Sequence, residues 1–526
     1  MAKFMEKHFT KLINTLIFLL IVNLFIYIFF GSKALMNSDS AFIVDYSLEQ
    51  IRTHSFFPKN WVNTNDFWVY SLIPLITIFL KLGLNLFLSR QLSVFIQTCL
   101  IFLILYDLFK KQLKDKTGFK IILLLFLSGI SGQFIFEVYG DATYGSIIFY
   151  MILELWLFIK YLNDKKIINL ILLFAILMLI TACSIRFPIY IGAPLICCLL
   201  YFIYDKGFKK EYIKTFISIV LAIGVGFLLN KYLSNVLTIS TATSKELLSD
   251  SSLFNKSIDD TLFNYFWLCG ATGLNVFSLT AFYKTDLITS SSPFVIVSFI
   301  KFIYAIVTLL LPIILLKKFN KMKKSEKILF IFSSSLLIII LFFLIICGMS
   351  SWYRYITPVL FFLNMLYPLC YKYYFSNVKK NRIVFGIFII SCVGASLFLN
   401  ITSYYDLKKL SIKENNYQNI ANYLVKKNLK YGYVYNGQEH NVYNLITNGK
   451  LRITRITSDG KEPYYWLNSK DWFKKEYYNG KVFFMRGEYD KSLEFEKLAT
   501  NSYKYDGYVI FVFDNNSIIL DSLHVN

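Results

Sequence analysis

The sequence predicts a polytopic α-helical membrane protein with about eleven transmembrane helices and a small extracellular α/β domain at its C-terminus. The first observation is composition: the 526 residues are 56% hydrophobic and 18% aromatic but only 17% charged. That is too apolar for an ordinary soluble protein. The second is that apolar runs recur through residues 1–400, most of them long enough to cross a hydrocarbon core of roughly 30 Å. The third is that residues 401–526 are mixed in polarity instead.

The positive charge is distributed as a membrane protein requires. The net charge is +22, and residues 401–526 hold 18 Lys and Arg against 14 Asp and Glu, leaving 37 and 19 in residues 1–400. This surplus lies between the apolar runs, where the positive-inside rule places it. We therefore expect the positive charge to interact with membrane lipid and not with nucleic acid. The eight Cys show no regular spacing, so no disulfide framework is predicted.

The first apolar run, 12–30, is predicted to be a retained helix with a cytoplasmic N-terminus. It lacks a small-residue cleavage site and is too long for the core of a signal peptide. The segment 67–87 is interrupted by Lys81, so we expect it to lie in the outer interface. With this topology the lysine-rich loops face the cytoplasm. Ten further spans are predicted at 88–108, 121–138, 144–162, 167–183, 189–204, 213–233, 294–316, 328–347, 356–374 and 383–399.

Residues 401–526 read as a separate external α/β domain, and residues 1–400 as a transmembrane domain with long outer segments at 32–87 and 234–292. In the C-terminal part, strand-like runs alternate with helical stretches, which is typical of an α/β unit. The predicted strands are 431–435, 451–457, 482–485 and 508–513, and the predicted helical stretches are 414–427, 466–477 and 492–500.

Two acidic residues stand at the predicted outer ends of spans. Asp39 follows the first span in Asn-Ser-Asp-Ser-Ala, and Asp141 follows the third, with glycines on both sides that permit a tight turn and the close approach of a ligand. Glu137 lies one turn before Asp141. A simpler reading remains open, in which Ser38 or Asp39 caps an interfacial helix and Asp141 caps the fourth span.

Two arginines stand out because the chain otherwise uses lysine. Eight of the 55 basic residues are Arg, and Arg186 and Arg354 are the basic residues of the short outer loops. A planar guanidinium matches phosphate oxygens in a way that an ammonium does not. Tyr353 and Tyr355 flank Arg354, and Lys59 is a third possible phosphate contact. Snorkelling to lipid head groups, or a simple ion pair, is the alternative for each arginine.

Several classes of chemistry lack their motifs. The chain has no Walker A loop, GxSxG, HExxH or CxxC, and its four His cannot build a His-rich metal site. Nucleotide hydrolysis is therefore not expected. Glu154 stands alone in the fourth span, and Lys301 in the eighth is predicted to snorkel. The chains of buried ionisable groups expected of a proton-coupled pump are missing from the spans.

This layout resembles the glycosyltransferase C superfamily, whose members use lipid-linked sugars and include the protein O-mannosyltransferases and the aminoarabinose transferases. The resemblance is carried by Asp39, by Asp141, by Arg354-Tyr355-Ile356-Thr357-Pro358 at the start of a late span, and by the external C-terminal domain. More narrowly, Asn37-Ser38-Asp39-Ser40-Ala41, Phe56-Phe57-Pro58-Lys59-Asn60-Trp61, and Tyr431-Gly432-Tyr433 before Thr447-Asn448-Gly449-Lys450 resemble membrane proteins of streptococci and their relatives.

The resemblance implies a fold of glycosyltransferase C type and a role for each acid. Asp39 would be the catalytic base, and Asp141 would position the acceptor or bind a divalent cation, Mg²⁺ or Mn²⁺. No DxD or DxH pair occurs at Asp141, and the His-Pro-Pro or Lys-Pro-Pro element after the first outer loop is absent. Metal dependence is therefore left open.

The expected reaction transfers a sugar from an undecaprenyl-phosphate-linked donor to a cell-surface glycan or glycopolymer, with inversion, on the outer face of a Gram-positive cell membrane. The donor phosphate would be bound by Arg354, Arg186 and Lys59, and the acceptor or sugar would contact Glu137, Tyr139, Tyr353 and Tyr355. Alternatives are a flippase or exporter of lipid-linked sugars, which would use Glu154 and Lys301, a polysaccharide polymerase or ligase, or a noncatalytic scaffold.

Overall fold

The computed structural model divides the chain into two compact units. Unit one is formed by 1–30, 95–230 and 246–411, and unit two by 31–94, 231–245 and 412–526. Each unit has a core of its own and is described by itself. The structure describes residues 2–64, 66–141, 143–239, 259, 261–262, 293–346, 354–435, 439–457 and 459–523. Most of the predicted outer segment 234–292 therefore lies outside the described residues, as does Tyr353.

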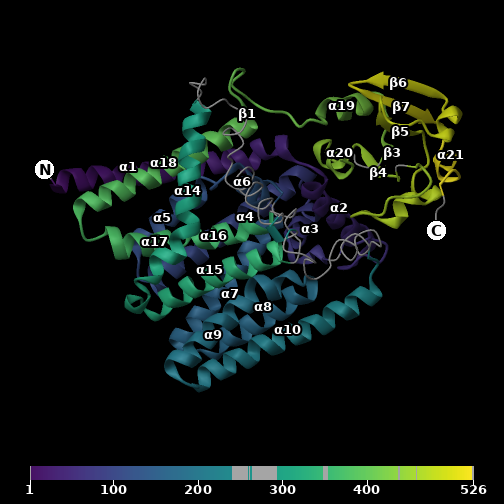
Figure 1. Ribbon diagram of the computed structural model, residues 1–526. Helices are drawn as coiled ribbons and strands as arrows, with labels where there is room; N and C mark the ends of the chain where they lie inside the picture. The colour runs from purple at the N-terminus through teal and green to yellow at the C-terminus, as the bar shows by residue number, and fades with distance from the viewer. Residues whose placement is uncertain are drawn as a thin grey trace. The chain divides into compact units, whose positions relative to one another are not determined.

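Unit one is a helical bundle (Figure 1). Its helices follow the predicted apolar runs, with α4 beginning in unit two. They are α1 (Ala2–Phe29), α4 (Leu86–Asp107), α5 (Lys116–Leu127), α6 (Gly132–Ile135), α7 (Thr143–Asp164), α8 (Ile167–Cys183), α9 (Ala193–Lys206), α10 (Lys210–Val236), α14 (Pro293–Leu316), α15 (Lys324–Ile345), α16 (Thr357–Asn364), α17 (Tyr367–Cys370) and α18 (Lys379–Tyr404).

The predicted number of eleven spans is not confirmed. Within the described residues, seven helices are long and apolar enough to cross a membrane, and the bent pair formed by α5 with the segment Gly132–Gly140 could be an eighth. The apolar parts of α1 and α8 are shorter. The predicted span 356–374 is divided among α16, α17 and the π-helical segment Tyr371–Phe375.

The outer faces of these helices are apolar. Phe18, Leu103, Leu228 and Ile338 are each at least 64% exposed, and such side chains would face water in a soluble protein. α7 differs, because 72% of its most apolar stretch is buried by the rest of the chain. The bundle therefore has an internal helix surrounded by helices with lipid-compatible faces, and the chain is a multi-pass membrane protein.

The predicted span 121–138 is not one straight helix. It bends by 88° between α5 and α6, where Gly129 and Ile130 both have positive φ angles. The ammonium of Lys301 on α14 donates to the Ile130 carbonyl oxygen and, at 2.9 Å, to the Ser396 hydroxyl. Lys301 is fully buried, so the prediction that it snorkels is wrong. Its side-chain nitrogen donates to backbone that the bend leaves without a helical partner.

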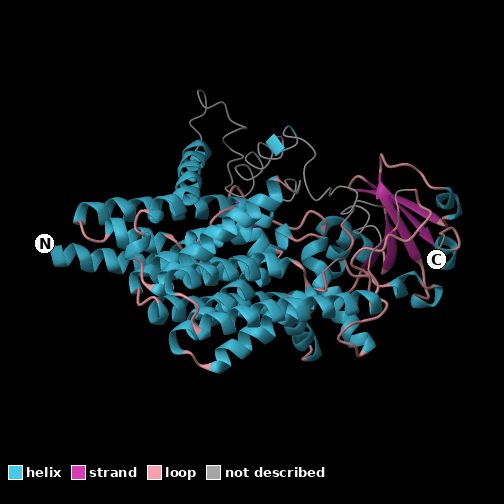
Figure 2. Ribbon diagram, turned by 60° about the horizontal axis from the view of Figure 1, so that its bottom comes forward, coloured by secondary structure: helices cyan, strands magenta, loops and turns pink. Residues whose placement is uncertain are grey.

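Unit two contains a five-stranded mixed sheet (Figure 2). The strand order is β4-β3-β5-β7-β6, with β3 parallel to β4 and β5, and β7 antiparallel to β5 and β6. The strands are β3 (Tyr431–Val434), β4 (Arg452–Arg455), β5 (Val482–Gly487), β6 (Asn501–Tyr505) and β7 (Tyr508–Phe513). Helices α19 (Gln418–Lys426), α20 (Asn441–Ile446) and α21 (Ser517–Leu520) accompany the sheet, and a separate two-residue ladder pairs β1 (Tyr405–Asp406) with β2 (Ser411–Ile412).

The four predicted strands are confirmed, but two of the predicted helical stretches are wrong. The stretch 466–477 forms only the 3₁₀ turns Lys470–Phe473 and Lys475–Tyr477, and 492–500 forms the 3₁₀ turn Glu494–Leu498. β6 and α20 were not predicted. Burial determines the local conformation of this stretch. Trp472 and Phe473 in the first turn are packed into the core, and such tertiary packing overrides a weak helical preference.

Unit two also contains the predicted first outer segment. Helix α2 (Ser38–Thr53) packs against α3 (Ile73–Lys81) and against α20, and the 3₁₀ turn Trp68–Tyr70 precedes α3. The sequence had assigned this segment to the transmembrane domain, whereas its contacts group it with residues 412–526. The helix that carries Asp39 therefore shares a core with the C-terminal sheet.

Buried charges join α2 to the C-terminal part of unit two. The guanidinium of Arg452 lies 3.4 Å from the Asp45 carboxylate, and the Asn444 amide donates to the same carboxylate. One turn later, the Trp472 indole N–H donates to Glu49 at 3.0 Å. Because both acids are almost fully buried, these bonds replace the water that the acids lose on folding.

Candidate functional site

Asp141 follows a π-helical turn at Phe136–Gly140 and is 95% buried. The glycines around it allow close packing of the protein. A Cβ on Gly145 would lie 2.5 Å from the Val138 carbonyl oxygen, and one on Gly140 would lie 2.8 Å from the Tyr27 hydroxyl. The close approach that these glycines permit is therefore made by atoms of the chain itself. This packing fixes the turn that carries Asp141.

Three segments that are distant in the sequence converge beside this turn. Tyr144, in the first turn of α7, is buried and lies within electrostatic range of both Arg186 and Arg354, as well as of two further tyrosines. The Arg186 guanidinium lies 5.1 Å from the centre of the Tyr355 ring. The Tyr190 hydroxyl donates to the Tyr355 carbonyl oxygen at 3.0 Å. We call Tyr144, Arg186, Tyr190, Arg354 and Tyr355 the arginine–tyrosine cluster.

This cluster has the chemistry of an anion site. Arg186 and Arg354 are both half-buried, so their electrostatic attraction for an anion is screened less than at an open surface. The contact of Arg186 with the Tyr355 ring orients the guanidinium before any ligand arrives. Two planar cations, one of them oriented by this contact, suit a phosphate group that carries two or more negative oxygens.

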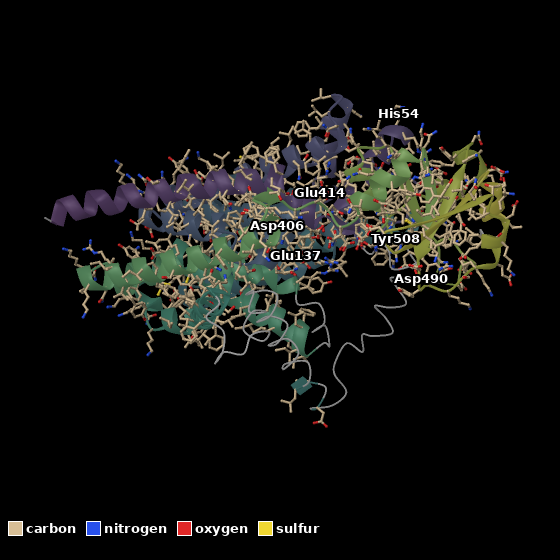
Figure 3. The ribbon with its side chains drawn as sticks, turned by 90° about the horizontal axis from the view of Figure 1, so that it is seen from above. His54, Glu137, Asp406, Glu414, Asp490 and Tyr508 are labelled. Carbon is tan, nitrogen blue, oxygen red and sulfur yellow. The ribbon has the colours of Figure 1, made fainter. Side chains whose placement is uncertain are left out.

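Two predicted contacts near Asp141 are engaged in packing. Glu137 is buried among the helices of unit one (Figure 3), and its Oε1 accepts a hydrogen bond from the Gln133 amide at 2.5 Å. Tyr139 is fully buried against Phe126, and its hydroxyl donates to the Phe126 carbonyl oxygen at 3.3 Å. This burial favours a structural role for Tyr139 over the predicted contact with sugar.

In unit two, Asp39 occupies the first turn of α2 without capping it. The cap is Asn37, whose side-chain oxygen accepts from the Ser40 N–H at 2.9 Å, while the Ser40 hydroxyl oxygen accepts from the Asn37 N–H at 2.9 Å. The alternative in which Ser38 or Asp39 caps this helix is therefore wrong. Asp39 is half-buried, and the positive end of the helix dipole lies beside it.

Residues of the C-terminal part surround this turn. The Ser38 N–H donates to the Glu439 carboxylate, and the Ser38 hydroxyl lies 3.5 Å from Nδ1 of His440. Burial holds the pKa of His440 well below its usual value, with a smaller contribution from the charge of Arg455. Arg455 lies within electrostatic range of Asp39 and Glu439, and its guanidinium carbon is 4.2 Å from the centre of the Tyr464 ring.

Arg455 is a candidate that the sequence reasoning missed. The rarity of arginine could have found it, because residues 401–526 contain only three. Burial lowers the pKa of Arg455, and this effect is partly offset by Tyr464 and, to a smaller extent, by Glu439 and Asp39. Lys59 has an exposed side chain. Asp39 and Lys59 belong to unit two, and Arg354 belongs to unit one. Their convergence on one site stays a prediction.

The described residues offer no preformed metal centre: no three His, Cys, Asp or Glu side chains among them come together in a way that could hold an ion. A cation at Asp141 would depend on water and on substrate phosphate oxygens, which Mg²⁺ accepts in many sites. The binding of a divalent cation by Asp141 stays an open expectation.

No family model matches the chain, and no curated protein matches it. Similar solved structures include three of the Archaeoglobus fulgidus oligosaccharyltransferase: a complex with Zn and sulfate, an apo form, and a complex with an inhibitory peptide and a dolichol-phosphate. Their TM-scores are 0.47, 0.44 and 0.43, at 11%, 12% and 10% identity.

These structures match 90%, 86% and 93% of this chain, which spans 68%, 65% and 70% of theirs, or about two thirds of their length. A likeness at this level assigns no fold, activity, substrate or metal to this chain.

Proposed function

We propose that this chain is a membrane glycosyltransferase that moves a sugar from an undecaprenyl-phosphate carrier to a cell-surface glycan or glycopolymer, with inversion. The observation that carries the proposal is the arginine–tyrosine cluster. Arg186 and Arg354 come from separate parts of the chain, and both lie within electrostatic range of the same buried tyrosine, Tyr144. In a chain with 55 basic residues, of which eight are Arg, this placement favours a ligand that needs guanidinium groups.

The chemistry of such a donor fits the groups at hand. A polyprenyl-phosphate sugar carries its own leaving group, so no nucleotide is needed outside the cell. Asp39 takes the proton of an acceptor hydroxyl, and the hydroxyl oxygen forms a bond to the anomeric carbon. The bond from that carbon to the phosphate oxygen breaks, and its electron pair stays on the lipid phosphate. Arg354 and Arg186 stabilise the charge that develops there.

The cap geometry supports the role proposed for Asp39. Because Asn37 and Ser40 satisfy the start of α2, the Asp39 carboxylate is not required to cap the helix. Its helix is fixed by the buried Asp45–Arg452 pair. A base held by a rigid element keeps its geometry better than one on a free loop.

The exporter alternative is less well supported. It relied on two ionisable groups within the spans, Glu154 and Lys301. Lys301 is held by Ile130 and Ser396 and therefore serves the bend between α5 and α6. A polymerase or ligase with a lipid-diphosphate donor would call for more arginines than the two in the cluster. The transferase is thus the function we propose.

The test is a transfer reaction in proteoliposomes with purified protein, a panel of radiolabelled undecaprenyl-phosphate hexoses and a cell-wall polymer acceptor. A transferase releases one undecaprenyl phosphate for each sugar that appears on the acceptor, whereas an exporter moves the donor intact. Arg354→Lys should lower both products about 10²- to 10³-fold, as expected for loss of an oxyanion-stabilising donor. Arg382→Lys, on α18 outside the cluster, is the matched control.

Transfer by Arg354→Lys at the rate of Arg382→Lys would remove Arg354 from the mechanism. Movement of the donor across the bilayer without release of lipid phosphate would replace the transferase with the exporter.

A further inference from the structure

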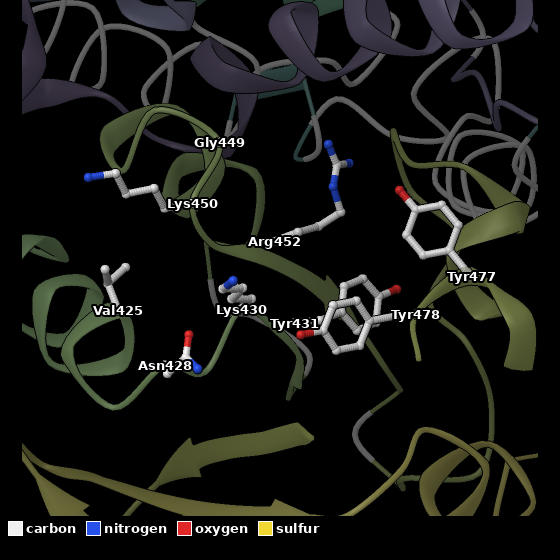
Figure 4. Close-up of a pocket in the computed structure, with 9 residues that line it drawn as sticks. All are labelled: Val425, Asn428, Lys430, Tyr431, Gly449, Lys450, Arg452, Tyr477 and Tyr478. Carbon is white, nitrogen blue, oxygen red and sulfur yellow. The ribbon is translucent and has the colours of Figure 1, made fainter. Parts of the chain in front are cut away.

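The C-terminal part of unit two contains a cavity of about 670 Å³ (Figure 4). It lies where the parallel strands β3 and β4 begin, between the end of α19 and the segment that follows the 3₁₀ turn Lys475–Tyr477. This volume is in the range of small-ligand sites. Its lining residues are Val425, Asn428, Lys430, Tyr431, Gly449, Lys450, Arg452, Tyr477 and Tyr478.

The lining is strongly cationic. Lys430, Lys450 and Arg452 are three of the nine lining residues, and no lining residue within the described part of the chain is acidic. Both lysines are exposed, and neither forms an ion pair with another described residue. Cations that lack protein partners and face a shared cavity attract an anion from solvent.

Arg452 has bonding capacity to spare at this cavity. One of its terminal nitrogens lies 3.4 Å from Asp45, while the other, Nη1, is buried and has no hydrogen-bond partner among the described residues. A buried donor of this kind is costly unless a partner is supplied. An anionic oxygen in the cavity would supply one.

Tyrosines form another wall of the cavity. The rings of Tyr431 and Tyr478 are stacked, with centroids 5.2 Å apart and an angle of 18°, and the Tyr477 ring lies 5.6 Å from that of Tyr431. Tyr431 is buried and fixed by its bond to the Trp472 carbonyl oxygen, while Tyr477 and Tyr478 are half-buried. Rigid aromatic faces beside hydroxyl groups suit a ring with both apolar and polar faces, such as a sugar.

We infer that this cavity is a binding site for an anionic saccharide, in which a sugar ring packs on Tyr477 and Tyr478 and its phosphate or carboxylate groups are held separately by Lys430, Lys450 and Arg452. The inference rests on the proposed function and deepens it, because it names the class of acceptor. A lipid fits less well, since among the described lining residues Val425 alone has an aliphatic side chain, and an acyl chain needs a longer apolar channel.

The experiment measures binding to the purified full chain in detergent micelles. The probes are a fluorescent oligogalacturonate, a glucose-substituted glycerol-phosphate oligomer, and a neutral maltooligosaccharide of the same length. We expect at least one anionic probe to bind and the neutral probe to bind at least about tenfold more weakly, since each charge-assisted contact contributes about tenfold or more. Equal binding of neutral and anionic probes, or no binding, overturns the inference.

Variants locate the bound probe. Lys430→Gln with Lys450→Gln should weaken binding at least about tenfold, whereas the matched pair Lys426→Gln with Lys491→Gln, which removes two exposed charges outside the cavity, should leave it within about twofold. Tyr478→Ala should weaken binding and Tyr478→Phe should keep it, because stacking needs only the ring. Equal loss in both lysine pairs would show nonspecific attraction and overturn the site.

The inference can fail independently of the proposed reaction. Binding is measured without transfer, so Asp39→Asn should bind the probe as the wild type does. If the cavity variants bind normally while Arg354→Lys loses transfer, the saccharide site is wrong and the transferase stands. If anionic lipid in nanodiscs binds at the cavity and the saccharide probes do not bind there, the ligand is a lipid head group. That result overturns the inference.

Discussion

Replacing Asp45 with Asn tests how unit two holds the helix that carries Asp39. Burial raises the pKa of Asp45 from 3.8 to about 6, against the opposing effects of Arg452 and Asn444. The folded state therefore binds the proton more tightly than the unfolded state, and stability falls as pH rises from about 4 to about 6. A shift of roughly two pKa units corresponds to about 3 kcal/mol over the whole range. Roughly half of this change in the free energy of unfolding, about 1.4 kcal/mol, occurs between about pH 5 and about pH 7.5.

The assay is thermal unfolding in detergent micelles, followed by tryptophan fluorescence. Trp61 and Trp472 report on unit two, because they are fully buried and pack edge to face at 5.9 Å. The difference in stability between wild type and Asp45→Asn should change by about 1.4 kcal/mol between the two pH values, since Asn cannot titrate. Groups present in both proteins cancel in this difference. A difference that is the same at both pH values would refute the reasoning.

Three further predictions concern local features. Asn37→Ala should destabilise unit two by about 0.5–2 kcal/mol, whereas Asn37→Asp, also a good cap, should cost much less; thermal unfolding measures both. Because the pKa of His440 is depressed in the folded state, its contribution to stability is present above about pH 6.5 and is lost as pH falls below that value. His440→Asn should therefore lose less stability on acidification than the wild type. Equal losses in the two proteins would contradict this. Gly145→Ala should destabilise unit one by about 1–3 kcal/mol through overlap with the Val138 carbonyl, while Gly394→Ala, where nothing lies within 4 Å, should not destabilise it.

The positions of the helices could be predicted from the sequence because an apolar run requires a lipid-compatible environment wherever it lies. The predicted span 144–162 became α7 (Thr143–Asp164) with small changes at its ends. The bend after α5 could not be found in this way, since hydropathy is the same for a straight and a broken helix. The predicted helix at 466–477 is wrong for a related reason. Its aromatic residues are compatible with a helix locally, but they pack into the core from 3₁₀ turns.

Two members of the arginine–tyrosine cluster were already candidates in the sequence, and their role as a site stays a prediction. The rarity of arginine pointed to Arg186 and Arg354, and the structure brings both to Tyr144. The same rarity distinguishes Arg452 and Arg455, which lie outside the short outer loops. The cap of α2 is Asn37 and not the predicted Ser38 or Asp39, because Asn, Ser and Asp have nearly equal cap preferences. Such a choice depends on backbone geometry, which the sequence does not specify.

The central claim is that Asp39 removes the proton from the acceptor hydroxyl, and its most direct test is the rate of sugar transfer by purified Asp39→Asn. The variant should unfold at the temperature of the wild type, bind donor as the wild type does, and transfer sugar about 10²- to 10⁴-fold more slowly. Transfer at the wild-type rate by the folded variant would contradict the account.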